Sequence, residues 1–329
     1  LKVEKVEIGL TQKPITFWGP IPLQKKTKKK VHVNFNPSLY NCKSNEDIKT
    51  RINAIWEEML QKNPRCFDAT KFRQAGLHLE DGRVIIEVGL SSYKEVCGTN
   101  LSENCIELRG KGEAEFGDDS AYLSNALGGG LLLVTVDGYV VVGRRASWVC
   151  EFPGFLDRPG GHAEPDNVSS LKKETIHARA DTDLHQAVFD EIWSFPQQEA
   201  EAEYGIGPEL MQDYGFLGTV ICKVDTYRPS LEFFARLTIT SSEMRLLYNK
   251  GTQVEANETS GLHMIDPYIL GCLLHHLTGK KQETCTCIQR EVGENKNKYH
   301  KQAANMVHEL TPALRGALIL AAEILLKNV

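Results

Sequence analysis

The sequence lacks an apolar run that could cross a membrane. The longest run, "LGGGLLLVTV" from Leu127 to Val136, falls far below the ~18 residues that a membrane helix needs. The apolar stretch "GALILAAEILL" carries Glu323, which predicts an amphipathic helix packed on the protein. No apolar secretory segment opens the chain, and because residue 1 is Leu1 rather than methionine we expect a trimmed start. We therefore expect a soluble protein with no membrane partner, in the cytoplasm or, alternatively, in the nucleus.

The chain also lacks an excess of positive charge. Its 329 residues include 38 lysines and arginines against 43 aspartates and glutamates, a formal net charge of −5. No overall basic field gathers nucleic acid, so we expect no nucleic-acid partner. The local exception is "KKTKKK" from Lys25 to Lys30, where we favour a solvated tail over a localisation signal or an anionic-surface contact.

A framework of paired cysteines is missing as well. The nine cysteines are an odd number scattered along the chain, a pattern typical of a reducing compartment. Cys285 and Cys287, with His275 and His276 before them, raise the question of a zinc site. Structural zinc sites usually space their cysteines by about two to four residues, so we favour a surface segment over zinc.

What is present is the pattern of a globular protein with several strand pairs. Asp81-Gly82 and Asp137-Gly138 are dipeptides preferred in tight hairpins, and each separates two runs rich in apolar residues. Two further strands are predicted around Arg228-Pro229. Residues 1–45 are basic and irregular, and we expect little structure there. A helix is predicted in "NEDIKTRINAIWEEMLQKNP", with an apolar stripe at Ile48, Ile52, Ile55, Trp56 and Met59.

Between the second and third strand pairs lie a glycine loop, a polar insertion and a helix. The loop, "DRPGGHAEPDNVSS", contains Gly160-Gly161, which lets the backbone approach an anion. The residues from Asp166 to His185 are polar and poor in aromatics, which predicts a surface excursion. The helix follows in "AVFDEIWSFPQQEAEAEYGI" and is predicted to end at Gly205 in a left-handed C-cap.

Pro196 complicates this helix. Proline inside a helix removes a hydrogen bond and costs about 3 kcal/mol. The helix therefore either kinks at Pro196 or begins there, with Ser194 as its N-cap. In the second case Glu191 leaves the face that Glu199 and Glu203 share.

Glu199 and Glu203 are four residues apart and lie on one face of the predicted helix. Two carboxylates at this spacing repel unless a cation neutralises them, and Mg²⁺ takes one or two carboxylates together with waters and phosphate oxygens. A solvated helix face is the alternative for these two residues taken alone. His162 and Glu164 beside the glycine pair favour metal-assisted attack of water on a diphosphate. The expected cofactor is Mg²⁺, with Mn²⁺ as the alternative.

This layout resembles a Nudix hydrolase, whose signature is G-x5-E-x7-R-E-U-x-E-E-x-G-U, with U a bulky apolar residue. "QEAEAEYGI" aligns with the end of the signature, where Glu199 and Glu203 match glutamates that bind metal in that family. The sequence departs from it at Gln198, in place of the arginine, and at Ala202, in place of the first paired glutamate. The insertion also separates "PGGHAEP" from the helix.

A closer resemblance is to the divergent UDP-glucose diphosphatases among the Nudix hydrolases. That group also has glutamine before the first glutamate and an insertion after the glycine loop, but it has an acidic residue at the position of Ala202. The shared stretches cover roughly Ala54 to Ala317 in the same order: "AIWEEML", "FDATKFR", "GLSSYKEVCGTN", "GDDSAYL", "RPGGHAEP", "QEAEAE", "SLEFF", "ETSGL" and "TPALRGA".

The resemblance implies that Glu199 and Glu203 are the catalytic metal ligands and that Phe67 and Tyr93 contact the nucleotide. Uracil is a flat ring that needs an aromatic or apolar slot, although both rings could instead be ordinary core aromatics. The other implied substrate-binding residues are Arg145, Cys150 through its backbone, Asp157, His162 and Glu164. The alternatives are a surface cation for Arg145 and a structural loop network for the last three.

The resemblance implies a Nudix α/β/α sandwich with a smaller N-terminal α/β region. Residues 1–125 would form a tail and an α/β region that contributes to substrate binding, and residues 126–329 the Nudix hydrolase domain. The expected reaction is Mg²⁺-dependent hydrolysis of a small-molecule nucleotide sugar, UDP-glucose, to UMP and glucose 1-phosphate.

Two other functions stay open. A Nudix module that binds a nucleotide sugar without turnover is favoured by Gln198 and Ala202. Hydrolysis of another diphosphate, such as ADP-ribose or a coenzyme A derivative, is open because any base stacks on an aromatic ring. The general base is unassigned, with Glu232 in "SLEFF" as a candidate and Glu258 and Glu191 behind it.

Overall fold

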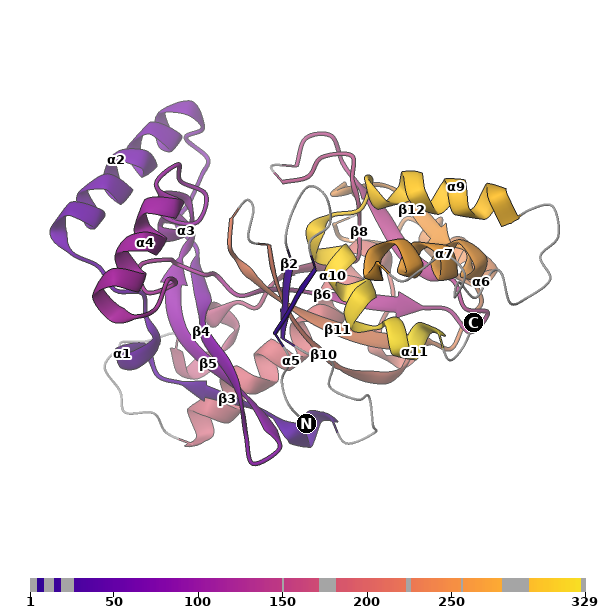
Figure 1. The fold of residues 1–329 in the computed structure, drawn as a ribbon, viewed down its shortest axis with the longest axis horizontal. Helices are drawn as coiled ribbons and strands as arrows, with labels where there is room; N and C mark the ends of the chain where they lie inside the picture. Colours follow the sequence, from indigo (N-terminus) through magenta and orange to yellow (C-terminus); the bar gives the residue numbers. More distant parts are fainter. Residues whose placement is uncertain are drawn as a thin grey trace.

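The computed structural model describes residues 5–8, 15–18, 27–149, 151–171, 182–222, 226–255, 257–279 and 296–326, which Figure 1 shows as a ribbon. The described strands form one large sheet and a second, three-stranded sheet. Cys285 and Cys287 of the zinc question lie outside the described residues. No helix in the described part of the chain is long and apolar enough to span a bilayer.

The predicted strand pairs are confirmed. β4 (Thr70–Glu80) and β5 (Arg83–Ser92) meet at Asp81 and Gly82, whose φ angles are 47° and 74°. Both residues are left-handed, as a tight hairpin of this length requires. The other two antiparallel pairs are β6 (Gly128–Val134) with β7 (Val140–Arg145), and β10 (Met211–Cys222) with β11 (Pro229–Leu237).

The large sheet places the glycine loop beside β6. Its order is β1 (Lys5–Ile8), β2 (Ile15–Trp18), β10, β11, β6, β7 and β12 (Thr259–Ile265). β6 and β11 run parallel, whereas the other neighbours run antiparallel. Two short strands extend the sheet: β8 (Leu156–Asp157) pairs with β7, and β9 (Gly160–His162) pairs with β6. The predicted loop is therefore partly strand.

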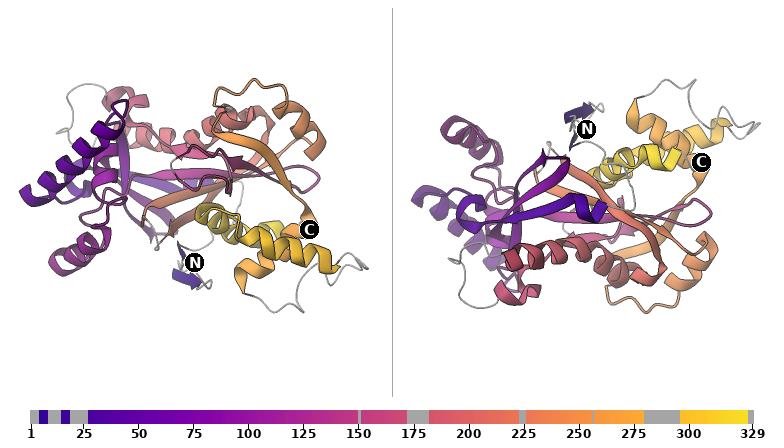
Figure 2. Two further views of the ribbon diagram at one scale, coloured as in Figure 1. Left: turned by 90° about the horizontal axis from the view of Figure 1, so that it is seen from above. Right: turned by 90° about the horizontal axis from the view of Figure 1, so that it is seen from below.

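Helices cover both faces of the large sheet (Figure 2). Leu131 and Leu133 of β6 belong to one buried cluster with α5 (Thr182–Tyr204), whereas Leu132 and Val134 belong to a cluster on the opposite face. This alternation follows from the two-residue period of a strand. The helices of the second cluster are α7 (Pro267–Thr278), α9 (Lys296–Val307), α10 (Pro312–Leu320) and α11 (Ala322–Leu326). The predicted α/β/α layering is confirmed.

The smaller sheet has the order β3 (Val31–Phe35), β5, β4, with β3 parallel to β5. Its residues share a continuous apolar cluster with α5 and the large sheet. The predicted helix is α2 (Glu46–Lys62), which buries Ile48, Ile52 and Trp56 of the expected stripe. The neighbouring helices are α1 (Pro37–Tyr40), α3 (Tyr93–Gly98) and α4 (Cys105–Phe116).

α5 runs through Pro196 without ending there. The alternative in which the helix begins near Ser194 is therefore wrong, and Glu191 stays on the same helix as the two predicted metal ligands. The helix ends as predicted at Gly205, which has a φ of 72° and donates its backbone N–H to the carbonyl of Glu201 at 2.9 Å. α5 is followed by the short turn η4 (Pro208–Leu210), and α6 (Ser241–Tyr248) follows β11.

The expectation of little structure over residues 1–45 is wrong. β1, β2, β3 and α1 all lie in this range: β1 pairs with β2, β2 with β10, and β3 with β5. The turn η1 (Thr27–Lys30) holds Lys28 at 3.2 Å from Asp190 of α5 and 5.5 Å from the centre of the Phe189 ring. This lysine contacts α5 rather than belonging to a free tail.

The insertion is also less superficial than predicted. Its described beginning forms two short turns, η2 (Pro165–Asn167) and η3 (Ser169–Leu171). Val168 between them is 4% exposed and joins the main apolar cluster. The prediction of a surface excursion is therefore wrong at Val168, and residues 172–181 lie outside the described residues.

Candidate functional site

Two adjoining cavities lie where β9 and α5 meet the N-terminal region. The larger has a volume of about 630 Å³ and includes Glu199 in its wall, and the smaller has a volume of about 360 Å³ and includes Phe67 and Tyr93. Four residues line both cavities and mark their junction: Lys71, Ala126, His162 and Arg228. The structure thus brings residues of both halves of the sequence to one place.

The glycine pair contacts the glutamates of α5. The backbone N–H of Gly160 donates to Oε1 of Glu203 at 2.9 Å. A Cβ atom at Gly161 would overlap the carboxylate of Glu199, so only glycine leaves room for that side chain in its present position. The expectation that this pair seats an external anion is therefore revised, since the amide of Gly160 already holds a carboxylate of the chain itself.

Burial and like charge act together on the two glutamates. Burial, followed by Glu255 and Glu258, raises the pKa of Glu199 to about 7. Burial is also the main cause that raises the pKa of Glu203 to about 8, with Glu199 among the further causes. Two partly desolvated carboxylates that repel one another would be relieved by a cation between them.

The donor set at this wall fits a hard divalent cation. Glu199, Glu255 and Glu258 all line the larger cavity with carboxylates, which are the oxygen ligands that Mg²⁺ and Mn²⁺ prefer. Among the residues that the structure describes, no three acidic, histidine or cysteine side chains could hold a metal ion as they stand. The fit therefore rests on the type of donor and on the proximity of the charges.

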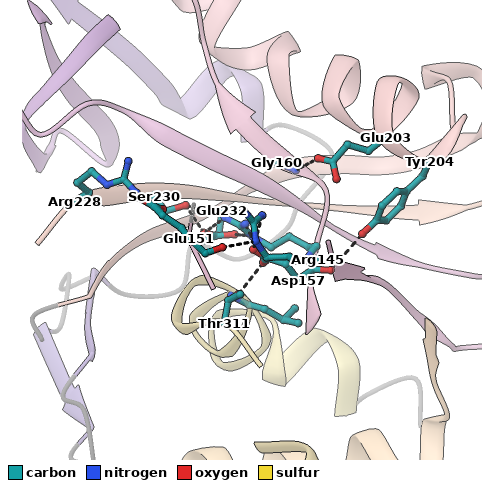
Figure 3. Close-up of polar contacts among 12 residues, drawn as sticks. Arg145, Glu151, Asp157, Gly160, Glu203, Tyr204, Arg228, Ser230, Glu232 and Thr311 are labelled. Atoms are coloured by element: carbon teal, nitrogen blue, oxygen red, sulfur yellow. Dashed lines mark hydrogen bonds and ion pairs between the residues drawn. The ribbon is translucent and has the colours of Figure 1, made fainter. Parts of the chain in front are cut away.

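Asp157 belongs to a buried ionic network in the wall of the larger cavity, and Figure 3 shows its polar contacts. Its Oδ1 accepts hydrogen bonds from Arg158 Nη1 at 3.1 Å and from Thr311 Oγ1 at 2.8 Å. Arg158 also donates from Nε and Nη2 to the two carboxylate oxygens of Glu232, at 2.9 and 2.8 Å. Asp157 is 9% exposed and lines the larger cavity, so its substrate-binding role stays a prediction beside the structural network it forms.

The same network decides against Glu232 as the general base. Its side chain is 0% exposed and both its oxygens are engaged by Arg158, so it has no access to a water in the cavity. Glu258 and Glu191 do line the larger cavity. Glu191 accepts hydrogen bonds from the backbone N–H of Glu164 at 3.1 Å and from Asn167 Nδ2 at 3.0 Å.

The aromatic pair implied by the resemblance lies in the smaller cavity. Phe67 is 75% exposed, so it is not a core aromatic, whereas Tyr93 is half-buried with its ring edge-on to Trp56. At the junction, desolvation lowers the pKa of His162 to about 3, with Arg228 and Lys71 as further causes. The imidazole of His162 is therefore neutral at physiological pH.

Two further predicted residues, Arg145 and Glu164, line the larger cavity. The Nε of Arg145, at the end of β7, donates to the backbone carbonyl of Glu151 at 2.9 Å, and its Nη1 is 3.7 Å from Asp157 Oδ2. Glu164 is half exposed and forms an ion pair with Lys71 at 3.1 Å. Cys150 lies outside the described residues.

The sequence reasoning missed the two cations at the junction. Lys71 lies on β4, and Arg228 comes immediately before β11, where the sequence indicates only a turn. No spacing motif links residues so far apart in the chain. Their shared position depends on how the small sheet packs against the large one.

Comparisons with known proteins give related Nudix enzymes. The uridine diphosphate glucose pyrophosphatase NUDT22 of Mus musculus is 35% identical over 219 residues, which cover 65% of this chain and 70% of that protein. The protein of the same name from Bos taurus is 33% identical over 225 residues, covering 65% and 74%. Nudix hydrolase 9 of Arabidopsis thaliana is 28% identical over 248 residues, covering 70% and 77%. No family model matches the chain.

Proposed function

The chain belongs to the Nudix hydrolase family, and from this membership we propose that it hydrolyses the diphosphate of a nucleotide sugar. UDP-glucose is the proposed substrate, and UMP and glucose 1-phosphate are the products. The observation that carries the proposal is the joined pair of cavities, with carboxylates on one side and exposed aromatic surface on the other. In a nucleotide sugar, a diphosphate that binds metal lies between a flat base and a sugar. The base would face the aromatic surface, and the diphosphate would face the carboxylates.

Glu199 and Glu203 would hold Mg²⁺ or Mn²⁺ through their carboxylates. When bound, the cation would polarise a phosphoryl oxygen of the substrate and lower the pKa of a bound water. β9 keeps both carboxylates in place, because the backbone N–H of Gly160 donates to Glu203 and Gly161 leaves space for Glu199. Glu258 and Glu191 are the candidate bases, since each lines the cavity and Glu232 is sequestered.

The N-terminal region, residues 1–125, would contribute the nucleotide-binding side. Phe67 and Tyr93 offer the base an aromatic surface, and Lys71 places a cation at the junction where the diphosphate would lie. Arg145 and His162 border the same space, the first as a charged donor and the second as a neutral one. Residues 126–329 would contribute the carboxylates and β9.

The test is a panel of nucleoside diphosphate sugars with Mg²⁺, with separation of the nucleotide and sugar-phosphate products. We expect UDP-glucose to be cleaved faster than ADP-ribose, and EDTA to abolish cleavage of both. Faster cleavage of ADP-ribose would assign the protein to another diphosphate, and full turnover in EDTA would refute the metal.

A module that binds a nucleotide sugar without cleaving it is the second candidate. Gln198 and Ala202 favour it, because the family signature has an arginine and a glutamate at these positions. Protein that binds UDP-glucose and leaves it intact in Mg²⁺ would decide for this candidate.

A further inference from the structure

The guanidinium of Arg228 has hydrogen-bonding capacity that its contacts within the protein do not satisfy. Its Nη2 forms an ion pair with both carboxylate oxygens of Glu151, and both residues line the larger cavity. Its Nε is buried and has no hydrogen-bond partner among the described residues. A buried guanidinium N–H without an acceptor is costly, which indicates that the side chain is built to meet a further acceptor.

The backbone that carries Arg228 is fixed by the N-terminal region. Nδ2 of Asn100 donates to the carbonyl of Thr226 at 2.8 Å. The guanidinium carbon of Arg109 lies 3.6 Å from the centre of the Tyr227 ring, and Tyr227 has a φ of 53°. These contacts hold the residues before Arg228 in a specific turn, so its guanidinium is oriented before any ligand arrives.

The position of Arg228 relative to the two cavities indicates which group of a ligand could accept its hydrogen bonds. It lines both, together with Lys71 and His162, so it lies between the aromatic surface and the carboxylate wall. A carboxylate and a phosphate group present similar pairs of oxygens to a guanidinium. Glu151 therefore occupies the contact that a phosphate oxygen would make.

We propose that Arg228 is a diphosphate-binding residue and that Glu151 is its internal competitor, which gives up Arg228 when substrate phosphate enters. The inference rests on the proposed function and deepens it. Glu151 lowers the apparent affinity only for ligands that place a phosphate at the junction, and a ligand without such a phosphate neither displaces Glu151 nor is weakened by it. The pair thus selects for diphosphates over nucleosides.

The test measures binding of UDP and of uridine by calorimetry in EDTA, so that no turnover intervenes. Arg228→Gln should weaken UDP binding about 10- to 100-fold, the loss expected for a charge-assisted contact. Glu151→Gln should tighten UDP binding about three- to tenfold, because the competitor loses its charge. Uridine binding should stay unchanged in both variants. Arg236→Gln is the matched control, since Arg236 pairs with Asp213 at 3.6 Å and lines neither cavity.

The outcomes separate the inference from the proposed function. Weaker UDP binding in Glu151→Gln, with a melting temperature lowered as much as in Arg228→Gln, would reduce the pair to a structural contact and overturn the inference. Unaltered UDP binding in a folded Arg228→Gln, or in Arg228→Lys if the first variant does not fold, would overturn it too. Wild-type protein that binds no UDP and cleaves no UDP-glucose would refute the proposed function as well.

Discussion

At position 161, even a methyl group would lie where the Glu199 carboxylate now lies. Gly161→Ala should therefore leave the fold intact, because the flexible end of Glu199 can move, while the carboxylate leaves its place beside Glu203. We expect the affinity for Mn²⁺ to fall about tenfold or more, measured by calorimetry on metal-free protein. Gly110→Ala in α4 is the control, because a Cβ atom there meets nothing within 4 Å and Gly110 lines neither cavity. Equal Mn²⁺ affinity in Gly161→Ala and wild type would show that Glu199 is not a ligand.

Glu199→Gln keeps the shape of the side chain and removes one negative charge from the proposed metal site. Turnover of UDP-glucose should fall by about a hundred- to a thousandfold, as for loss of a group that stabilises developing charge. UMP binding in EDTA should stay within about tenfold of wild type, since Phe67, Tyr93 and Arg145 are untouched. Glu201→Gln on the same helix is the control, because Glu201 is exposed. Near wild-type turnover in Glu199→Gln would mean that another helix holds the metal.

Residues near one another in the sequence could be predicted as a site, and distant ones could not. Glu199 and Glu203 follow from the four-residue repeat of a helix, which is local. Arg158 stands between the predicted Asp157 and Gly160, yet its burial against Glu232 depends on a strand 74 positions later. The same holds for Lys71 and Arg228, which meet through the packing of two sheets.

Among the elements, the turns η2 and η3 pack on the main apolar cluster through Val168 and Leu171. Val168 is 4% exposed within the main apolar cluster. Val168→Ala should lower the free energy of unfolding by about 1–3 kcal/mol, from lost burial and the cavity left behind. Urea denaturation measures the loss, with the exposed Ser169→Ala as control. A value equal to that of the control would show that the insertion does not depend on this contact.

The contact between α5 and β9 makes the stability of the metal-free protein depend on pH. The pKa values of Glu199 and Glu203 are raised, to about 7 and about 8, so the folded state favours their protonated forms. The stability they contribute is present at low pH and is lost as pH rises through these values. We expect the melting temperature in EDTA to fall between about pH 6 and pH 8.5, and Mg²⁺ to restore more of it at the higher pH. A melting temperature that rises over this interval in EDTA would contradict the burial of these carboxylates.

At the scale of the whole molecule, the layers were predictable and the N-terminal strands were not. Hairpins around Asp81-Gly82 and Asp137-Gly138 depend on local turn chemistry, which the sequence displays. β1 and β2 lie in a basic stretch, and the place of β2 beside β10 is set by pairing with residues that the chain reaches much later. Pro196 shows the converse, because the buried face of α5 outweighs a local cost of about 3 kcal/mol.

Two hydrogen bonds in the wall of the larger cavity join residues far apart in the sequence, which affects the order of folding during synthesis. Asn100 reaches Thr226 across 126 positions, and Asp157 reaches Thr311 across 154. Contacts this distant close late, since loop-closure entropy is lost before they form. Before the residues near Thr311 leave the ribosome, the strands of the small sheet can already pair. The wall of the larger cavity is still incomplete at that stage. Apolar strands of the large sheet would then stay exposed, and the site incomplete, until the residues near Thr311 have been synthesised.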